Sequence, residues 1–140
     1  MLKGLDPLLG PDLLFTLRAM GHGDEIALVD GNYPAEEHGR RVIRADGHGV
    51  IALVHAVLSV MPLDDMVKAN ALLPKPPRPQ AIHAAMRAAV ARHEPRARLA
   101  VLAPDRFYAR VKEAHAIVAT SEPALYANII LRKGVIYPGG

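Results

Sequence analysis

The sequence contains no cysteine, and aromatic residues make up only 4% of its 140 residues. Without cysteine the chain can form no disulfide, thiol nucleophile or cysteine–zinc site. With so few aromatic rings, the core must be built from Ala, Val, Leu and Ile, and hydrophobic residues reach 51% of the chain. This apolar content excludes a disordered protein, and the length fits one domain.

Long hydrophobic runs are also missing. The longest apolar stretch, residues 50–61, is interrupted by His55 and Ser59, whereas a membrane-spanning helix needs about 20 apolar residues. The opening "MLKGLDPLLG" has an acid and a proline where a signal peptide needs an unbroken apolar run. We therefore expect a cytoplasmic protein with no membrane partner.

Several common binding motifs are absent. No GxGxxG or GxxxxGK loop occurs, and none of the seven histidines forms the i, i+4 pair of zinc proteases. A metal would need carboxylates and histidines such as His22, Asp24 and His48, which is a less favoured alternative. The net charge is +3, but the basic residues are scattered and no aromatics interleave with them. We therefore expect no nucleic-acid partner.

Helix and strand patterns alternate along the chain, which indicates an α/β fold. We expect helices from Pro11 to a left-handed cap at Gly21, and over residues 50–61, 80–93 and 105–113. We expect strands over residues 25–30, 41–45, 99–103, 115–120 and 128–131, and an extended segment within 66–73. The stretch "PKPPRP" at 74–79 predicts a stiff polyproline loop.

The segment "MGHGDEIALVD", residues 20–30, holds a histidine between two glycines. The ordinary pKa of histidine, near 6.5, lets His22 exchange protons at neutral pH, and Asp24 is placed to fix its tautomer. These residues alone leave open whether His22 is catalytic or only packs at the helix end. Of the other histidines, we expect His83 and His93 to lie in solvent and His55 to lie in the core.

Asp30 follows the first expected strand, at the strand end where open α/β sheets bind ligands. If that strand is extended, it separates Asp30 from His22 by more than about 20 Å. A molecule that contacts both therefore needs a bend near Gly23 or a second subunit. Tyr126 and Asn128 would share one side of an extended segment. A phenol beside a carboxamide suits recognition of hydroxyl groups, although both side chains could instead cap loop backbone.

Four motifs together carry a family resemblance. They are "MGHGDEI" followed by Asp30 and Pro34, "VIRADG" at 42–47, "AIVAT" at 116–120, and "LYANIILRKGV" at 125–135. With them the chain resembles the RbsD/FucU family of sugar mutarotases, and most closely its FucU branch, almost end to end. The resemblance implies a single three-layer α/β/α domain of RbsD-like type over residues 1–140. It also implies a ring-shaped homo-oligomer, often a decamer of two pentamers, with its sites at subunit contacts.

The resemblance assigns roles to particular residues. His22 matches the proton donor of the family, Asp30 a sugar-binding acid, and residues 126–128 (Tyr126, Ala127, Asn128) the segment that contacts the sugar. The family has an arginine or histidine where this chain has Pro104, so the nearby Arg106 is the candidate replacement ligand. The general base is left open between water and Tyr126.

The implied activity is that of a cofactor-free isomerase that interconverts the anomers of a free monosaccharide, with L-fucose as the first candidate. A base takes the proton of the anomeric hydroxyl while an acid protonates the ring oxygen. Two alternatives remain: a D-ribose pyranase, and a non-catalytic sugar-binding accessory protein of an uptake system. Residues 63–100 match the family poorly and leave the sugar open.

Overall fold

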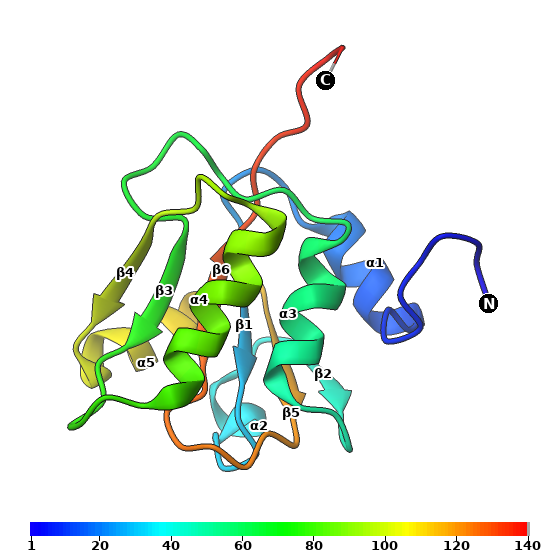
Figure 1. The fold of residues 1–140 in the computed structure, drawn as a ribbon. Coiled ribbons are helices and arrows are strands. Elements are labelled where there is room, and N and C mark those ends of the chain that lie inside the picture. Colours follow the sequence, from blue (N-terminus) through cyan, green and yellow to red (C-terminus); the bar gives the residue numbers. More distant parts are fainter. Residues whose placement is uncertain (140) are drawn as a thin grey trace.

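The computed structural model describes residues 1–139, which form a six-stranded sheet between two layers of helices (Figure 1). The strands are β1 Glu25–Val29, β2 Val42–Ala45, β3 Ala71–Pro74, β4 Leu99–Leu102, β5 Ala116–Thr120 and β6 Ile129–Arg132. The helices are α1 Pro11–Ala19, α2 Ala35–His38, α3 Val50–Leu58, α4 Ala81–His93 and α5 Pro104–Glu113. The expected α/β fold with three layers is confirmed.

The strand order is β2-β5-β1-β6-β3-β4, and β6 is antiparallel to both of its neighbours. The other five strands are parallel, so their carboxyl ends meet at one edge of the sheet, together with the start of β6. We call this the carboxyl edge and the opposite one the amino edge. In Figure 1 strand β1 points down toward the carboxyl edge.

Alternating side chains along the strands divide the core into two clusters. On one face, Ile26 and Leu28 pack with residues of α1, α3 and α4, and on the other face Ala27 and Val29 pack with α2 and α5. Helix α3 is apolar nearly all round, and six of its nine residues are buried. It is therefore the buried helix that the sequence predicts, although it ends at Leu58 rather than at residue 61. No helix within residues 1–139 combines the length and the apolar character needed to cross a membrane.

The end of α1 differs from the prediction. The helix stops at Ala19 with Met20 extended, and the left-handed backbone belongs to Gly23 (φ 88°) rather than to Gly21. The cause is Lys133, whose Nζ donates hydrogen bonds to the carbonyls of Leu17 and Met20. A lysine ammonium thus satisfies the terminal carbonyls that a glycine cap would otherwise satisfy.

Two smaller elements also depart from expectation. The extended segment predicted within 66–73 becomes a strand only at Ala71, and the four-residue helix α2 is new. One helical turn is too short to show the 3.6-residue periodicity from which helices are predicted.

Gly134 allows two chain segments to meet closely at the amino edge. Its N–H donates to the carbonyl of Pro62 over 2.8 Å, and the N–H of Asp64 donates to the carbonyl of Arg132 over 3.0 Å. A Cβ atom at Gly134 would overlap the backbone of Leu63. Only glycine therefore lets residues 62–64 lie against the end of β6.

We expect Gly134→Ala to lower the free energy of unfolding by about 1–3 kcal/mol, because the methyl group must displace backbone rather than a flexible side chain. Gly21→Ala is the matched control, since its Cβ would make only an ordinary contact with Asp24, at 3.7 Å. Urea unfolding followed by circular dichroism measures both. Equal, small losses for the two variants would contradict the close approach at Gly134.

Candidate functional site

A cavity of about 220 Å³ opens at the carboxyl edge, between the turn after β1 and the turn before β6. Asp30, Tyr126 and Asn128 line it, as do Tyr33 and Tyr108. The structure therefore brings together three of the residues that the sequence singles out. It adds two tyrosines that the sequence analysis missed.

Asp30 is buried, and its backbone N–H and one of its carboxyl oxygens are hydrogen-bonded. Its N–H donates to Oδ1 of Asn128 over 2.8 Å, and its own Oδ1 accepts the N–H of Asn32 over 3.0 Å. Burial raises the pKa of Asp30 above the ordinary value, and the N–H groups of Asn32, Ala127 and Tyr33 offset part of that rise. The backbone of Ala127 thus lies beside Asp30, and the Asp30 side chain lines the cavity.

The turn before β6 is not the extended segment that we expected. Tyr126 has a φ of 57°, in the left-handed region, so the expected alternation of an extended segment is wrong here, although Tyr126 and Asn128 do line the same cavity. The carbonyl of Tyr126 accepts a hydrogen bond from Nε2 of His83 over 2.7 Å. His83 is therefore half-buried against this turn, and the prediction that it lies in solvent is wrong.

His93, the other histidine expected in solvent, is also half-buried. Its Nε2 lies 2.9 Å from Nδ1 of His55, so the two rings share a hydrogen bond between α3 and α4. His55 itself is half-buried rather than a full core residue.

An aromatic group forms one wall of the cavity. The hydroxyl of Tyr33 is hydrogen-bonded to Nδ1 of His38 over 2.8 Å, and the rings of Tyr33 and Tyr108 lie 5.8 Å apart. Burial raises the pKa of Tyr33, which keeps its hydroxyl protonated at neutral pH. A ring with an apolar face and a polar tip suits a ligand that has both kinds of surface. The sequence signal was weak, because the three residues lie on α2, α5 and the turn between β1 and α2.

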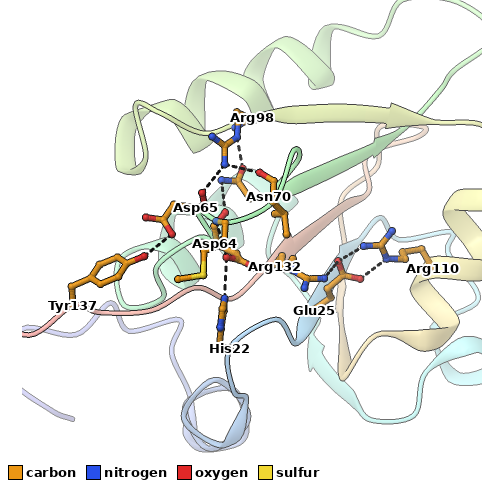
Figure 2. A network of polar contacts seen from close by, with 11 residues as sticks. His22, Glu25, Asp64, Asp65, Asn70, Arg98, Arg110, Arg132 and Tyr137 are labelled. Atoms are coloured by element: carbon orange, nitrogen blue, oxygen red, sulfur yellow. Dashed lines mark hydrogen bonds and ion pairs between the residues drawn. The ribbon is translucent and has the colours of Figure 1, made fainter.

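His22 lies at the amino edge, away from this cavity (Figure 2). Its Nε2 is 3.0 Å from Oδ1 of Asp64, and Nε of Arg132 donates to Oδ2 of the same carboxylate over 2.8 Å. Asp24, the expected partner, instead accepts the N–H of Gly21. Asp64 therefore fixes the imidazole, and the sequence analysis missed it because it belongs to the divergent stretch 63–100.

The electrostatics of Asp64 follow from its neighbours. Burial alone would raise the pKa of this carboxyl, but hydrogen bonds from Arg132 and His22 lower it to about 2. Asp64 is therefore an anion at neutral pH and accepts the Nε2 hydrogen of His22. Nδ1 is the ring nitrogen left to face a ligand.

Ion pairs extend from Asp64 across the amino edge. Nη1 of Arg132 lies 3.8 Å from Oε2 of Glu25, and Arg110 donates two hydrogen bonds of 2.7 Å to the carboxylate of Glu25 (Figure 2). These contacts tie β1, β6 and α5 together beside the His22 loop. Such a fork-to-fork arginine–carboxylate pair gives geometric rigidity as well as charge.

The remaining predicted residues do not join the cavity. His22 precedes β1 and Asp30 follows it, and the turn at Gly23 leaves His22 at the amino edge. Arg106 is exposed on the first turn of α5 and does not line the cavity. His48 lies at the carboxyl edge, where its carbonyl accepts the N–H of Ser121.

The positions of His22 and His48 argue against the alternative of a metal site within one chain. His22 and His48 stand at opposite edges, so the proposed set with Asp24 does not assemble in one chain. Across residues 1–139, moreover, no three side chains among His, Asp and Glu gather as metal ligands.

This chain is similar to several known proteins in sequence and in structure. The model of the RbsD / FucU transport protein family matches residues 3–136. A fucose mutarotase from Homo sapiens is 43% identical over 96% of this chain and 94% of that protein. An L-fucose mutarotase from Haemophilus influenzae is 40% identical over 96% and 97%. The crystal structure of the fucose mutarotase of Streptococcus pneumoniae with L-fucose superposes with a TM-score of 0.91 at 40% identity, covering 97% of this chain and 100% of that one.

We expect Asp64→Asn to destabilise the protein at pH 7. A folded-state pKa of about 2 against an ordinary 3.8 means that Asp64 stabilises the fold above pH 4, and that this contribution disappears as the pH falls toward 2. His22 is 42% exposed and Arg132 30%, so water screens the network and we expect a loss of about 1–2 kcal/mol.

Urea unfolding of the wild type and the variant at a series of pH values measures this contribution. The difference in free energy of unfolding between the wild type and Asp64→Asn should shrink steadily as the pH falls below 4. Asp46→Asn is the control, because Asp46 pairs with Arg44 on the exposed surface and its loss should leave the midpoint nearly unchanged. If that difference in free energy did not depend on pH, the charge of Asp64 would make no contribution to stability.

Proposed function

The chain belongs to the RbsD/FucU family, and we propose on this basis that it is a mutarotase, an isomerase that interconverts the anomers of free L-fucose. The support comes from relatives of that name at 40–43% identity and from a solved L-fucose complex of the same fold. We further propose that it acts in the cytoplasm.

The observation that carries the proposal is the polar grouping in the cavity at the carboxyl edge. The Asp30 carboxylate accepts hydrogen bonds, and the side chains of Tyr126 and Asn128 can both donate and accept them. The cavity is small for a drug-sized ligand and suits a single sugar ring. Asp30, Tyr126 and Asn128 would bind the ring hydroxyls, with the Ala127 backbone beside them. Arg106 stays a candidate ligand from the start of α5.

The chemistry needs one acid and one base. In the proposed step His22 starts as an imidazolium with a hydrogen on each ring nitrogen: Nε2–H stays bonded to Asp64, and Nδ1 donates its proton to the ring oxygen while a base removes the proton of the anomeric hydroxyl. The bond from the anomeric carbon to the ring oxygen breaks, and an open-chain aldehyde forms. Reclosure on the other face of the carbonyl gives the other anomer and returns both protons. Asp64 orients the imidazole through the hydrogen bond to Nε2, and the base is water or Tyr126.

His22 and Asp30 stand at opposite edges of one chain, so we propose that the complete site forms between two copies. Each edge presents apolar surface for such a contact. Leu125 is exposed beside the cavity, and Met66 is exposed beside Asp64. A contact of one edge with the opposite edge of the next copy is head-to-tail, and it gives a ring where the rotation between copies closes and a filament where it does not. We propose the ring-shaped homo-oligomer, with a decamer as the expectation from the family resemblance.

We expect the wild type to speed the anomer exchange of L-fucose and His22→Gln to lose about a hundredfold or more of that rate, or roughly 3 kcal/mol of barrier. The fold and much of the sugar affinity should remain, because glutamine is polar and of similar reach. Saturation-transfer NMR on equilibrated L-fucose and D-ribose measures the rates.

His48→Gln is the control for this variant, because His48 has the same glycine neighbours but lies at the other edge. If His22 only packed at the end of α1, its replacement would cost about 1 kcal/mol of stability and spare the rate. Equal, mild effects of both variants would refute the role of His22. Sugar binding by the wild type without exchange above buffer would refute the enzyme.

We expect activity to return when two inactive variants are mixed. Co-refolding equal amounts of His22→Gln and Asp30→Asn subunits should restore up to about a quarter of the wild-type rate. With random assembly, about one contact in four joins an intact His22 to an intact Asp30. Each variant alone should stay inactive.

Light scattering on the same samples establishes that the mixed subunits assemble. No recovery in a fully assembled mixture would place His22 and Asp30 outside a shared site. A monomeric wild type at micromolar concentration would refute the ring.

A further inference from the structure

One histidine outside the proposed chemistry contacts the sugar-binding turn. His83 lies in the first turn of α4, and its Nε2 donates to the carbonyl of Tyr126 over 2.7 Å. Within residues 1–139, Tyr126 is the one non-glycine residue with a positive φ. L residues rarely adopt this conformation, and it persists where surrounding contacts hold it.

The carbonyl that His83 holds belongs to the same peptide unit as the N–H of Ala127. Burial raises the pKa of Asp30, and the backbone of Ala127 is among the groups that offset part of that rise, so this peptide unit lies beside Asp30. A peptide unit is planar, so fixing the direction of its C=O also fixes the direction of its N–H. Two hydrogen bonds therefore hold this turn at its two sides: His83 holds the carbonyl of Tyr126, and the carboxamide of Asn128 accepts the backbone N–H of Asp30.

The proline-rich stretch explains why His83 is well placed. It connects the end of β3 to the start of α4, and the N–H of Lys75 donates to the carbonyl of Leu102 over 2.8 Å. Proline fixes its own φ near −65° and restricts the residue before it. The prolines therefore restrict the backbone of residues 74–79, which leads into the first turn of α4. From that turn His83 contacts the carbonyl of Tyr126.

We propose that His83 is a positioning residue for sugar binding: its hydrogen bond to Tyr126 holds the 126–127 peptide so that the carboxamide of Asn128 meets the N–H of Asp30 and lines the cavity. The inference rests on the proposed function for the identity of the ligand. The orientation of the turn itself can be tested without it.

The test compares three replacements of His83. His83→Leu and His83→Glu have no hydrogen to donate at neutral pH, whereas His83→Gln keeps an N–H at similar reach and should rescue the contact. Hydrogen exchange of the Ala127 amide, followed by NMR, reports the orientation of the peptide. We expect exchange about tenfold faster in the Leu and Glu variants and within about twofold of the wild type in the Gln variant, as for the loss of one hydrogen bond.

Kinetics with L-fucose give the second readout. The Leu and Glu variants should raise KM about five- to tenfold, because the sugar contacts loosen. Since His22 is untouched, kcat should change less than about threefold where water is the general base, and more where Tyr126 is that base. His93→Leu is the matched control: His93 lies on the same helix but bonds His55 at its far end. It should lower stability while leaving both KM and the Ala127 exchange within about twofold.

The two proposals fail in different ways. A wild type without anomer exchange removes the proposed function, while the Ala127 exchange still tests His83. Unchanged Ala127 exchange in the Leu and Glu variants overturns the role of His83, whatever the activity. If His83→Leu fails to fold, the comparison of His83→Gln with His83→Glu tests the proposal instead, since these two side chains have nearly the same shape. Equal Ala127 exchange and equal KM for that pair would also overturn it.

Discussion

The direction of strand β6 is the constraint on which the rest of the molecule depends. It runs between β1 and β3 against the direction of both, so it joins two parallel parts of the sheet. Its start places Asn128 against Asp30 at the end of β1, and its end places Arg132 against Asp64 beside the start of β1. One short strand therefore supplies polar groups to both functional edges. If β6 were parallel to β1, Asn128 would lie at the amino edge and Arg132 at the carboxyl edge.

The two edges use carboxylates in opposite ways. Asp64 is held as an anion by Arg132 and His22, which suits a group that orients an imidazole and balances its charge. Asp30 has a raised pKa, because its burial outweighs the N–H groups around it. Environments that push the pKa values of two carboxyls apart are typical of sites with separate roles for the two groups. Here the ion-pair network at the amino edge and the backbone cage at the carboxyl edge create that difference.

Local patterns predicted much of the fold and part of the site. The apolar stretch that became α3, the strand ending at Asp30 and the pair Tyr126 and Asn128 all follow from short-range rules. The same rules missed Asp64, because it lies 42 positions from His22 and carries no motif of its own. They also missed the left-handed backbone of Tyr126, whose carbonyl is hydrogen-bonded to a histidine 43 positions away. Contacts of this range are set by the packing of whole elements, and a single sequence does not show them.

The scarcity of aromatic residues has a practical consequence for optical work on the protein. The chain has four tyrosines and no tryptophan, so its intrinsic ultraviolet emission is tyrosine emission alone. Tyr33, Tyr108 and Tyr126 all line the one cavity at the carboxyl edge. The fourth, Tyr137, is bonded to Asp65 at the amino edge. Free sugars do not absorb in this range, so binding can be followed by the fluorescence of the unlabelled protein. The emission of three tyrosines reports on a ligand in the cavity, and the emission of Tyr137 reports on a contact at the opposite edge.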